Sequence, residues 1–267
     1  MTLVSRAVTR AVTRLLPIGA LVAAAVTGSC TDINAAADHV ASLEFDTLPF
    51  PAVVAGDSLR DSLGHVRPLR AVAFNSAGDV VPDAAIQYIA LDSGVAIDGN
   101  DILVAQRKTG TVRLIASTDK IQSGFKLLTV ARPPAIVIVP GKLVDTVNTS
   151  LLNPAANVSG GLGVKVITAD TADGIGVTQG WLVSYQAFFH NVAIAPGDTS
   201  VAFLVDGTRR TSLDTTSTDG TASRSVQVKP IGITSQLDSV IVMATVRYKG
   251  AQVQGSPVRF VILVRSN

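Results

Sequence analysis

From residue 40 onward the chain is a series of short runs in which apolar and polar residues alternate, each followed by turn-forming residues. Successive side chains of a β-strand point to opposite faces, so this alternation predicts strands with one buried and one exposed face. Apolar residues at the spacing of a helical face are nearly absent after Val26. Together these features predict an all-β fold.

The region around Asn75 is typical of this pattern. Alternate residues from Leu69 to Ala73 lie on one side of an extended run, which ends at Asn75 and is followed by Ser-Ala-Gly-Asp. Gly78 accepts a positive φ without steric cost, and the Asn75 side chain can bond to the backbone of the turn. We therefore predict a hairpin here, and similar units recur at the short spacing of a β-sandwich.

Residues 40–131 contain an ordered set of such elements. A Gly56 entry turn comes before the strand that ends at Asn75, and an aromatic strand with Tyr88 follows, then Val-Ala-Ile-Asp at 95–98 and Gly-Thr-Val-Arg-Leu-Ile-Ala at 110–116. This order resembles the bacterial immunoglobulin-like family of the group-2 type. The resemblance implies a sandwich whose core contains Tyr88, at the family's usual tryptophan position.

A second sandwich is predicted after Arg132-Pro133-Pro134, because two prolines stiffen a short linker and resist incorporation into a central strand. Residues 136–267 contain a strand with Trp181, a Thr-Asp-Gly-Thr-Ala-Ser turn at 218–223 and a final Ser-Pro-Val-Arg-Phe strand from Ser256. The last two elements resemble group-1 bacterial immunoglobulin-like domains of invasin and intimin type adhesins. We predict two immunoglobulin-like β-sandwiches in series, residues 40–131 and 136–267, joined by a linker at 132–135 into a semi-rigid rod, with Trp181 in the second core.

The N-terminal segment predicts export. Three arginines and no acidic residue come before the apolar run Leu15–Val26, and Thr27-Gly28-Ser29 then leads into Cys30, the only cysteine of the chain. Twelve residues of helix span roughly 18 Å, too short for a hydrocarbon layer of about 30 Å. Residues 1–29 therefore form a signal peptide.

This segment resembles a bacterial lipoprotein signal, although the family usually has leucine where this chain has Thr27. The resemblance implies a lipid on Cys30, a tether at 30–39, and membrane attachment through that lipid. Thr31 follows the cysteine in place of the aspartate that often marks inner-membrane retention, so the resemblance implies the outer membrane. The alternative is cleavage after Ala35-Ala36-Ala37, which would leave a soluble secreted protein.

Charge argues against a nucleic-acid partner. Without residues 1–29 the chain has 19 basic and 20 acidic residues, and its densest basic cluster is the pair Arg209-Arg210. The net charge is close to zero and the sequence contains no basic cluster large enough to bind a phosphate backbone.

No catalytic or metal-binding motif stands out, and we predict a protein that is not an enzyme and needs no cofactor. The three histidines lack zinc-site spacing, and no G-x-S-x-G elbow occurs. Calcium is the one metal to weigh, because oxygen ligands cluster at Asp98–Asp101 and at Asp170–Gly174. The alternative is that turns simply require Asp, Asn and Gly.

The candidate ligand-binding loop is Gln186–Ser200, which is longer than a tight sandwich connection and carries Phe188, Phe189 and His190. The alternative is that the two phenylalanines cap the core. The sequence predicts an envelope-anchored protein that presents a non-catalytic surface for adhesion or serves as a spacer, with an unknown protein or polysaccharide ligand. A carbohydrate-binding lipoprotein and a soluble secreted protein are the alternatives.

Overall fold

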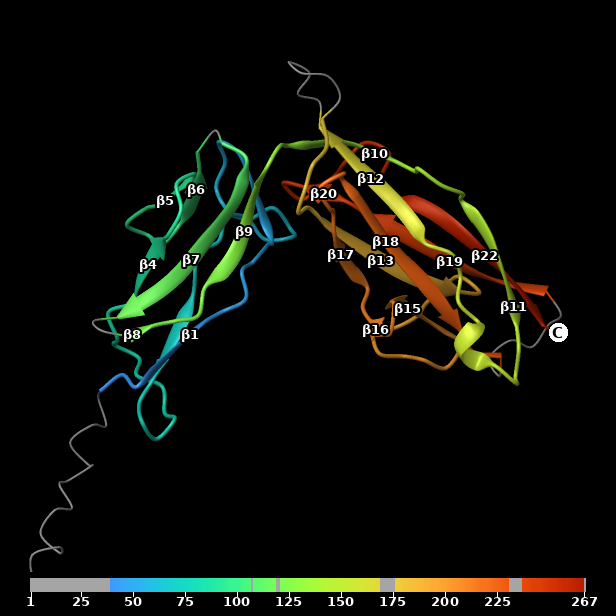
Figure 1. Cartoon of the computed structure of the whole chain (residues 1–267), viewed down its shortest axis with the longest axis horizontal. Coiled ribbons are helices and arrows are strands. Elements are labelled where there is room, and N and C mark those ends of the chain that lie inside the picture. Colours follow the sequence, from blue (N-terminus) through green and yellow to red (C-terminus); the bar gives the residue numbers. More distant parts are fainter. Residues whose placement is uncertain (1–38, 107, 119–120, 169–175, 231–236, 267) are drawn as a thin grey trace, which may run out of the picture.

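The computed structural model describes residues 39–106, 108–118, 121–168, 176–230 and 237–266. Within these ranges the protein is all-β, and its one helix is the single 3-10 turn η2 (Pro154–Ala156). The described residues include no helix of the length and apolarity needed to cross a membrane. Strands pair within two groups, β1 to β9 and β10 to β22, which form two immunoglobulin-like β-sandwiches in series (Figure 1). We call them the N-terminal and C-terminal modules.

The N-terminal module has one five-stranded sheet with the order β2-β9-β7-β4, extended by β8 on β7, and two ribbons, β1–β3 and β5–β6. Its inner face carries leucines of alternate positions, including Leu114 and Leu128, both fully buried. The strands are β1 (Ser42–Phe45), β2 (Ala52–Val54), β3 (Ala71–Phe74), β4 (Gln87–Ala90), β5 (Val95–Ile97), β6 (Leu103–Ala105), β7 (Gly110–Thr118), β8 (Ile121–Gln122) and β9 (Lys126–Ala131).

The C-terminal module has two facing sheets, with the orders β10-β12-β18-β15-β16 and β11-β22-β19-β13-β14, and β17 also pairs with β13. A separate ribbon, β20–β21, lies at the end nearest the N-terminal module. The strands are β10 (Pro134–Ile138), β11 (Val144–Thr149), β12 (Leu162–Thr168), β13 (Leu182–Phe189), β14 (Val192–Ala193), β15 (Ala202–Asp206), β16 (Arg209–Arg210), β17 (Leu213–Thr215), β18 (Thr221–Val228), β19 (Leu237–Thr245), β20 (Arg247–Tyr248), β21 (Ala251–Gln252) and β22 (Val258–Ser266).

Apolar side chains at alternate positions of the strands form the two cores. β12 and β18 alternate strictly between buried and half-buried positions, and Phe260 and Ile262 of β22 are fully buried. Tyr88, predicted to lie in the first core, is only half-buried on β4, where its ring lies 5.6 Å from that of Phe45. Tyr88 therefore packs against the core but does not lie at its centre, because β4 ends the sheet and one side of its residues has no strand beside it.

The hairpin predicted at Asn75 is confirmed. Asn75 Oδ1 accepts hydrogen bonds from the N–H groups of Ala77 and Asp79, both at 2.9 Å, and Gly78 has a φ of +88°. The Thr-Asp-Gly turn at 218–220 likewise leads directly into β18. In both places the local sequence is sufficient to fix the turn, because the required φ and the side-chain acceptor are supplied within a few residues.

One inward-facing position of the C-terminal module is occupied by a charge. Arg224 lies between Ala222 and Val226 on β18 and is 6% exposed. Its guanidinium Nη1 lies 2.8 Å from a carboxylate oxygen of Asp214, on β17, and 3.7 Å from one of Asp206. Because β17 pairs with β13 of the other sheet, this ion pair connects the two sheets.

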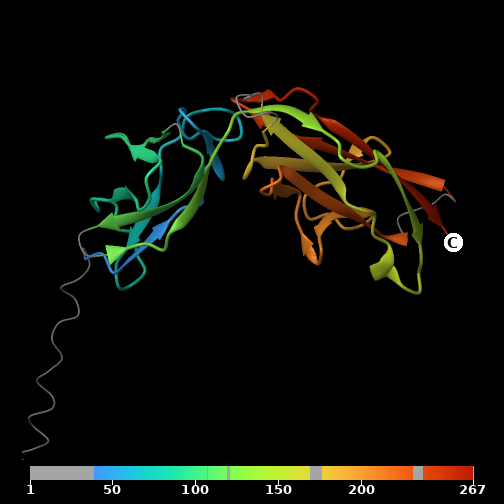
Figure 2. The same cartoon turned by 45° about the horizontal axis from the view of Figure 1, so that its top comes forward.

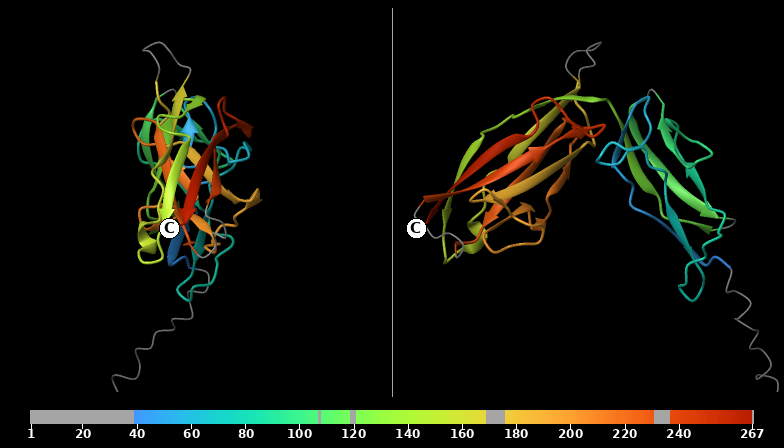
Figure 3. Two further views of the ribbon diagram at one scale, coloured as in Figure 1. Left: turned by 90° about the vertical axis from the view of Figure 1, so that its right-hand side faces the viewer. Right: turned by 180° about the vertical axis from the view of Figure 1, so that it is seen from behind.

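The modules form an arch in place of the predicted rod. β9 ends at Ala131 and β10 begins at Pro134, inside the expected linker, so two residues make the connection, which lies on the convex side of the arch (Figures 1 and 2). The view from behind shows the same arrangement, with the start of the N-terminal module at one free end and the C-terminus at the other (Figure 3). Beside this linker the two modules are in direct contact, through the rings of Phe50 and Trp181 and the ion pair of Asp57 and Lys249.

Candidate binding surface

The predicted binding loop is mostly a hairpin. β13 extends to Phe189, a two-residue turn at His190 and Asn191 follows, and β14 starts at Val192. The φ angles of His190 and Asn191 are 48° and 63°, the left-handed pair that a tight β-hairpin requires. The prediction of a long loop from Gln186 was therefore wrong, and only the segment after Ala193 forms a loop.

Phe188, Phe189 and His190 do not form an open aromatic platform. Phe189 packs against the core, and its ring stacks on that of His190 with centroids 3.9 Å apart. His190 Nε2 lies 3.1 Å from both carboxylate oxygens of Asp238, and since a carboxylate only accepts, Nε2 carries the hydrogen. These residues lock the turn between β13 and β14 onto β19.

Strand register places this turn at one end of the six-stranded sheet. Phe189 pairs with Val240 near the start of β19, Leu237 at that start pairs with Arg265 near the end of β22, and Ser266 pairs with Thr149 at the end of β11. The β13–β14 turn, the start of β19 and the loop after β11 therefore lie in a row about 20 Å long, at a strand spacing of about 4.8 Å. We call this row the distal rim.

Large apolar side chains project from the distal rim into solvent. The exposed fractions are 72% for Leu151, 99% for Leu152, 70% for Val192 and 59% for Leu237. Full burial of a leucine is worth about 1.5–3 kcal/mol, which Leu151 and Leu152 forgo in the isolated chain. Clustered exposed apolar residues are typical of a surface that binds a partner.

The loop that carries the two leucines is held in place by a buried asparagine. Asn157 is fully buried, its amide nitrogen donates to the carbonyl oxygen of Ser150 at 3.1 Å, and its Oδ1 accepts from the Ser150 N–H at 2.8 Å. Gln227 of β18 donates to the Pro154 carbonyl oxygen at 2.6 Å. The apolar tip is thus presented on a fixed loop. This site was not predicted from the sequence, although two leucines directly before Asn-Pro are an apolar pair in a turn.

A second feature is the junction between the modules. Trp181 is buried, as predicted, but it lies at this junction and not at the centre of a core: its ring centroid is 4.9 Å from that of Phe50 in the N-terminal module and 5.8 Å from that of Tyr248. Its indole N–H donates to the Arg247 carbonyl oxygen at 3.0 Å. The chain backbones also meet here, because a Cβ on Gly64 would lie 2.3 Å from the carbonyl carbon of Lys249.

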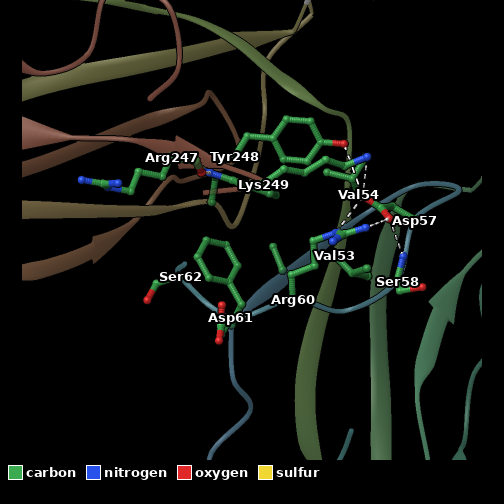
Figure 4. A pocket seen from close by; sticks show the side chains of 13 residues that line it. Val53, Val54, Asp57, Ser58, Arg60, Asp61, Ser62, Arg247, Tyr248 and Lys249 are labelled. Atoms are coloured by element: carbon green, nitrogen blue, oxygen red, sulfur yellow. Dashed lines mark hydrogen bonds and ion pairs between the residues drawn. The ribbon is translucent and has the colours of Figure 1, made fainter. Parts of the chain in front are cut away.

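Asp57 is the charged centre of the junction (Figure 4). Its carboxylate lies 3.0 Å from Arg60 in its own module and 3.1 Å from the Lys249 amino group of the other module. Burial alone would raise the pKa of Asp57, but the hydrogen bonds from Arg60, Lys249 and the Ser58 N–H outweigh it and lower the pKa to about 2. Because this value lies below the usual 3.8, the carboxylate stabilises the fold above about pH 4, and that contribution is lost as the pH falls through about 2.

The other predicted sites have different outcomes. Cys30 and the Asp170–Gly174 turn lie outside the described residues. Asp98 Oδ1 accepts hydrogen bonds from the N–H groups of Asn100 and Ile102, both at 2.9 Å, so this carboxylate organises its own turn. No group of three or more His, Cys, Asp or Glu side chains within the described ranges is arranged to hold a metal ion.

Comparison with solved structures finds an adhesin, a pair of intimin domains and domains of an S-layer protein. Over 85% of this chain, the Yersinia pseudotuberculosis adhesin InvE is similar at 13% identity and a TM-score of 0.30, and the chain spans 58% of that structure's length. The D0-D1 domain of intimin is similar over 83% of this chain and 98% of its own, at 14% identity and a TM-score of 0.27. Domains 4 and 5 of the S-layer protein SbsC are similar over 85% and 98%, at 11% identity and a TM-score of 0.30. No protein-family model and no curated protein sequence matches the chain.

Proposed function

We propose that this chain is an exported, non-catalytic envelope protein, anchored through a lipid on Cys30, whose two sandwiches carry the distal rim to a protein partner. The observation that carries the proposal is the pair Leu151 and Leu152, exposed on a loop that buried Asn157 holds in place. The rim and the start of β1 lie at opposite free ends of the arch (Figure 1). A chain attached before β1 would therefore hold the rim away from its anchor.

A protein partner fits the rim better than a polysaccharide does. Sugars are bound by exposed aromatic faces together with hydrogen-bonding side chains, whereas Phe188 and Phe189 are half-buried and one of them is stacked on His190. The rim instead presents aliphatic side chains, which gain free energy when another apolar surface covers them.

Export and anchoring are tested by replacing Cys30 with serine. In cells fed a clickable fatty acid, we expect the wild type to carry the label and to fractionate with the outer membrane, and Cys30→Ser to lose both properties. Protease treatment of intact cells then reports which face of the membrane the modules occupy. An unlabelled, soluble wild type would show ordinary secretion and remove the lipid anchor from the proposal.

The rim is tested by placing a photo-crosslinking amino acid at position 152 in intact cells. We expect a discrete protein adduct from position 152 and none from position 127, where Leu127 is similarly apolar and 58% exposed but lies on the N-terminal module. The free energy of unfolding of the variant Leu151→Ser/Leu152→Ser should lie within about 0.5 kcal/mol of that of the wild type, since both side chains are exposed. Equal adduct patterns from the two positions, or none from position 152, would contradict the rim as the binding surface.

A further inference from the structure

A cleft of about 320 Å³ opens between the two sheets of the C-terminal module. One wall is β13 near Ala187, the other is formed by Phe203 and Leu204 of β15 with Arg210 of β16, and the loop from Ile194 to Thr199 closes one end. Known small-molecule sites have volumes of about 300–1,000 Å³, so this cleft lies at the lower end of that range. It is separate from the distal rim and does not depend on the proposed function.

Main-chain hydrogen bonds fix two segments that border the cleft to β13. The Ile194 N–H donates to the Ala187 carbonyl oxygen at 2.9 Å, and the Tyr185 N–H donates to that of Ser212 at 2.7 Å. The two bonds attach different segments to the same edge of β13, on either side of Gln186. The cleft is therefore formed before any ligand arrives, so binding does not require the walls to be ordered first.

The lining is mainly apolar. Ala187 and Leu204 are buried at its base, Ile194 is half-buried, and Leu213 at its margin is 49% exposed. A ligand with an apolar body would cover Leu213 and displace water from the base, and both changes favour binding. The lining also has polar side chains, among them those of Gln186, Thr211 and Arg210, and small-molecule sites usually combine an apolar wall with such groups.

The charged residues of the lining are one cation, Arg210, and one carboxylate, Asp198. The Arg210 guanidinium carbon lies 4.7 Å from the centroid of the Phe203 ring, and the Lys229 amino nitrogen lies 5.7 Å from the same centroid. In the part of the chain that the structure describes, neither cation forms an ion pair. The only carboxylate in the lining, Asp198, lies on the loop and accepts the Ser200 N–H at 2.8 Å. An anionic group is therefore favoured on the Arg210 side.

We propose that this cleft binds a small organic anion with an apolar body, its anionic group paired with Arg210 and its body lying between β13 and β15. The Arg209-Arg210 pair, noted in the sequence as the densest basic cluster, then has a specific role: only Arg210 lines the cleft, while Arg209 precedes it on the same short strand. A charge-assisted hydrogen bond supplies the selectivity for an anion over a neutral molecule of equal size.

The test uses sodium octanoate as the probe, with octan-1-ol and acetate for comparison. Titration of the full mature chain, followed by amide NMR shifts, should move the signals of residues 194–199 and 211–213 with octanoate, and much less with acetate. Arg210→Gln should weaken octanoate binding about tenfold, since it removes a hydrogen bond to a charged group. Arg209→Gln, which makes the same change of net charge, should leave it within about twofold.

Three outcomes would overturn the proposal. Octanoate that leaves the cleft amides unmoved would exclude the site. Equal weakening by Arg209→Gln and Arg210→Gln would show that general electrostatic attraction is being measured. Binding of octan-1-ol as tight as that of octanoate would exclude recognition of the anionic group.

Discussion

Asp214→Ala is expected to lower the free energy of unfolding of the C-terminal module by about 3–5 kcal/mol, the cost typical of removing one partner from a buried ion pair. Arg224 remains in the variant, 6% exposed and facing the other sheet, and loses the carboxylate that lies 2.8 Å from its Nη1. The variant also removes the acceptor of the Ser223 N–H, which is 2.7 Å from Asp214 Oδ2. Denaturant unfolding followed by circular dichroism measures the change.

Asp206 provides the matched control. It is also an aspartate and also faces Arg224, but at 3.7 Å and with 64% of its side chain exposed. Exposed ion pairs contribute about 0–1 kcal/mol, so Asp206→Ala should be nearly neutral. Equal losses in the two variants would mean that Arg224 is stabilised by general negative potential and not by the inter-sheet pair.

The double variant Asp214→Ala/Arg224→Met separates the value of the ion pair from the cost of an orphaned charge. Replacing a buried ion pair by apolar side chains is often neutral, so the double variant should be more stable than Asp214→Ala alone. The arginine is also incompletely satisfied at present: among the described residues its Nε has no hydrogen-bond partner, and neither does the nearby Tyr185 hydroxyl. If the double variant is as unstable as Asp214→Ala, the loss comes from the Ser223 N–H and not from the buried charge.

Alternation in the sequence was enough to predict the fold class and most strands. At Asn75–Asp79 and at 218–220 the turn is determined by residues within it, so nothing distant had to be known. The β13–β14 turn was missed because it contains no glycine. His190 and Asn191 have positive φ there, and of the two only asparagine is a common turn residue. Its closure onto β19 depends on Asp238, far along the chain.

The sequence predicted which side chains are buried, but not which residues cover them. The period of a strand shows which face is covered but not what covers it, so Trp181 could be expected to be buried without the junction being foreseen. Arg224 interrupts the apolar face of β18, and the carboxylate that pairs with it, Asp214, lies on another strand, β17. The exposed Leu151 and Leu152 likewise depend on Asn157 and Gln227, whose contacts with the loop arise from the packed sheets.

The second large effect is expected at the junction. Trp181→Ala should lower the free energy of unfolding by about 3–5 kcal/mol, as for other buried aromatic side chains, and should let the modules separate. The reason is that one side chain connects both modules: the ring contacts Phe50 on one side and Tyr248 on the other. Small-angle scattering should then show a wider range of inter-module distances than in the wild type. An unchanged scattering profile together with an unchanged melting curve would mean that other contacts alone hold the arch.

Phe50→Ala tests the same contact from the other module and keeps the reporter. Trp181 is the only tryptophan of the chain, so its emission reports the junction alone. Removing the Phe50 ring should expose the indole to water and shift the emission to longer wavelength, while the C-terminal module stays folded, since the substitution lies outside it.

Backbone contact at the junction can be tested independently of any aromatic ring. Gly64→Ala should open the junction, because the added Cβ would lie 2.3 Å from the Lys249 carbonyl carbon and 2.4 Å from the Gly250 nitrogen. Gly78→Ala is the matched control: its φ of +88° is close to the +91° of Gly64, but nothing lies within 4 Å of its Cβ. Both variants therefore incur the same backbone strain in the N-terminal module, and only Gly64→Ala forces the modules apart. If both shift the Trp181 emission equally, strain within the module is the cause; if only Gly64→Ala does so, the bend of the arch is set by direct contact.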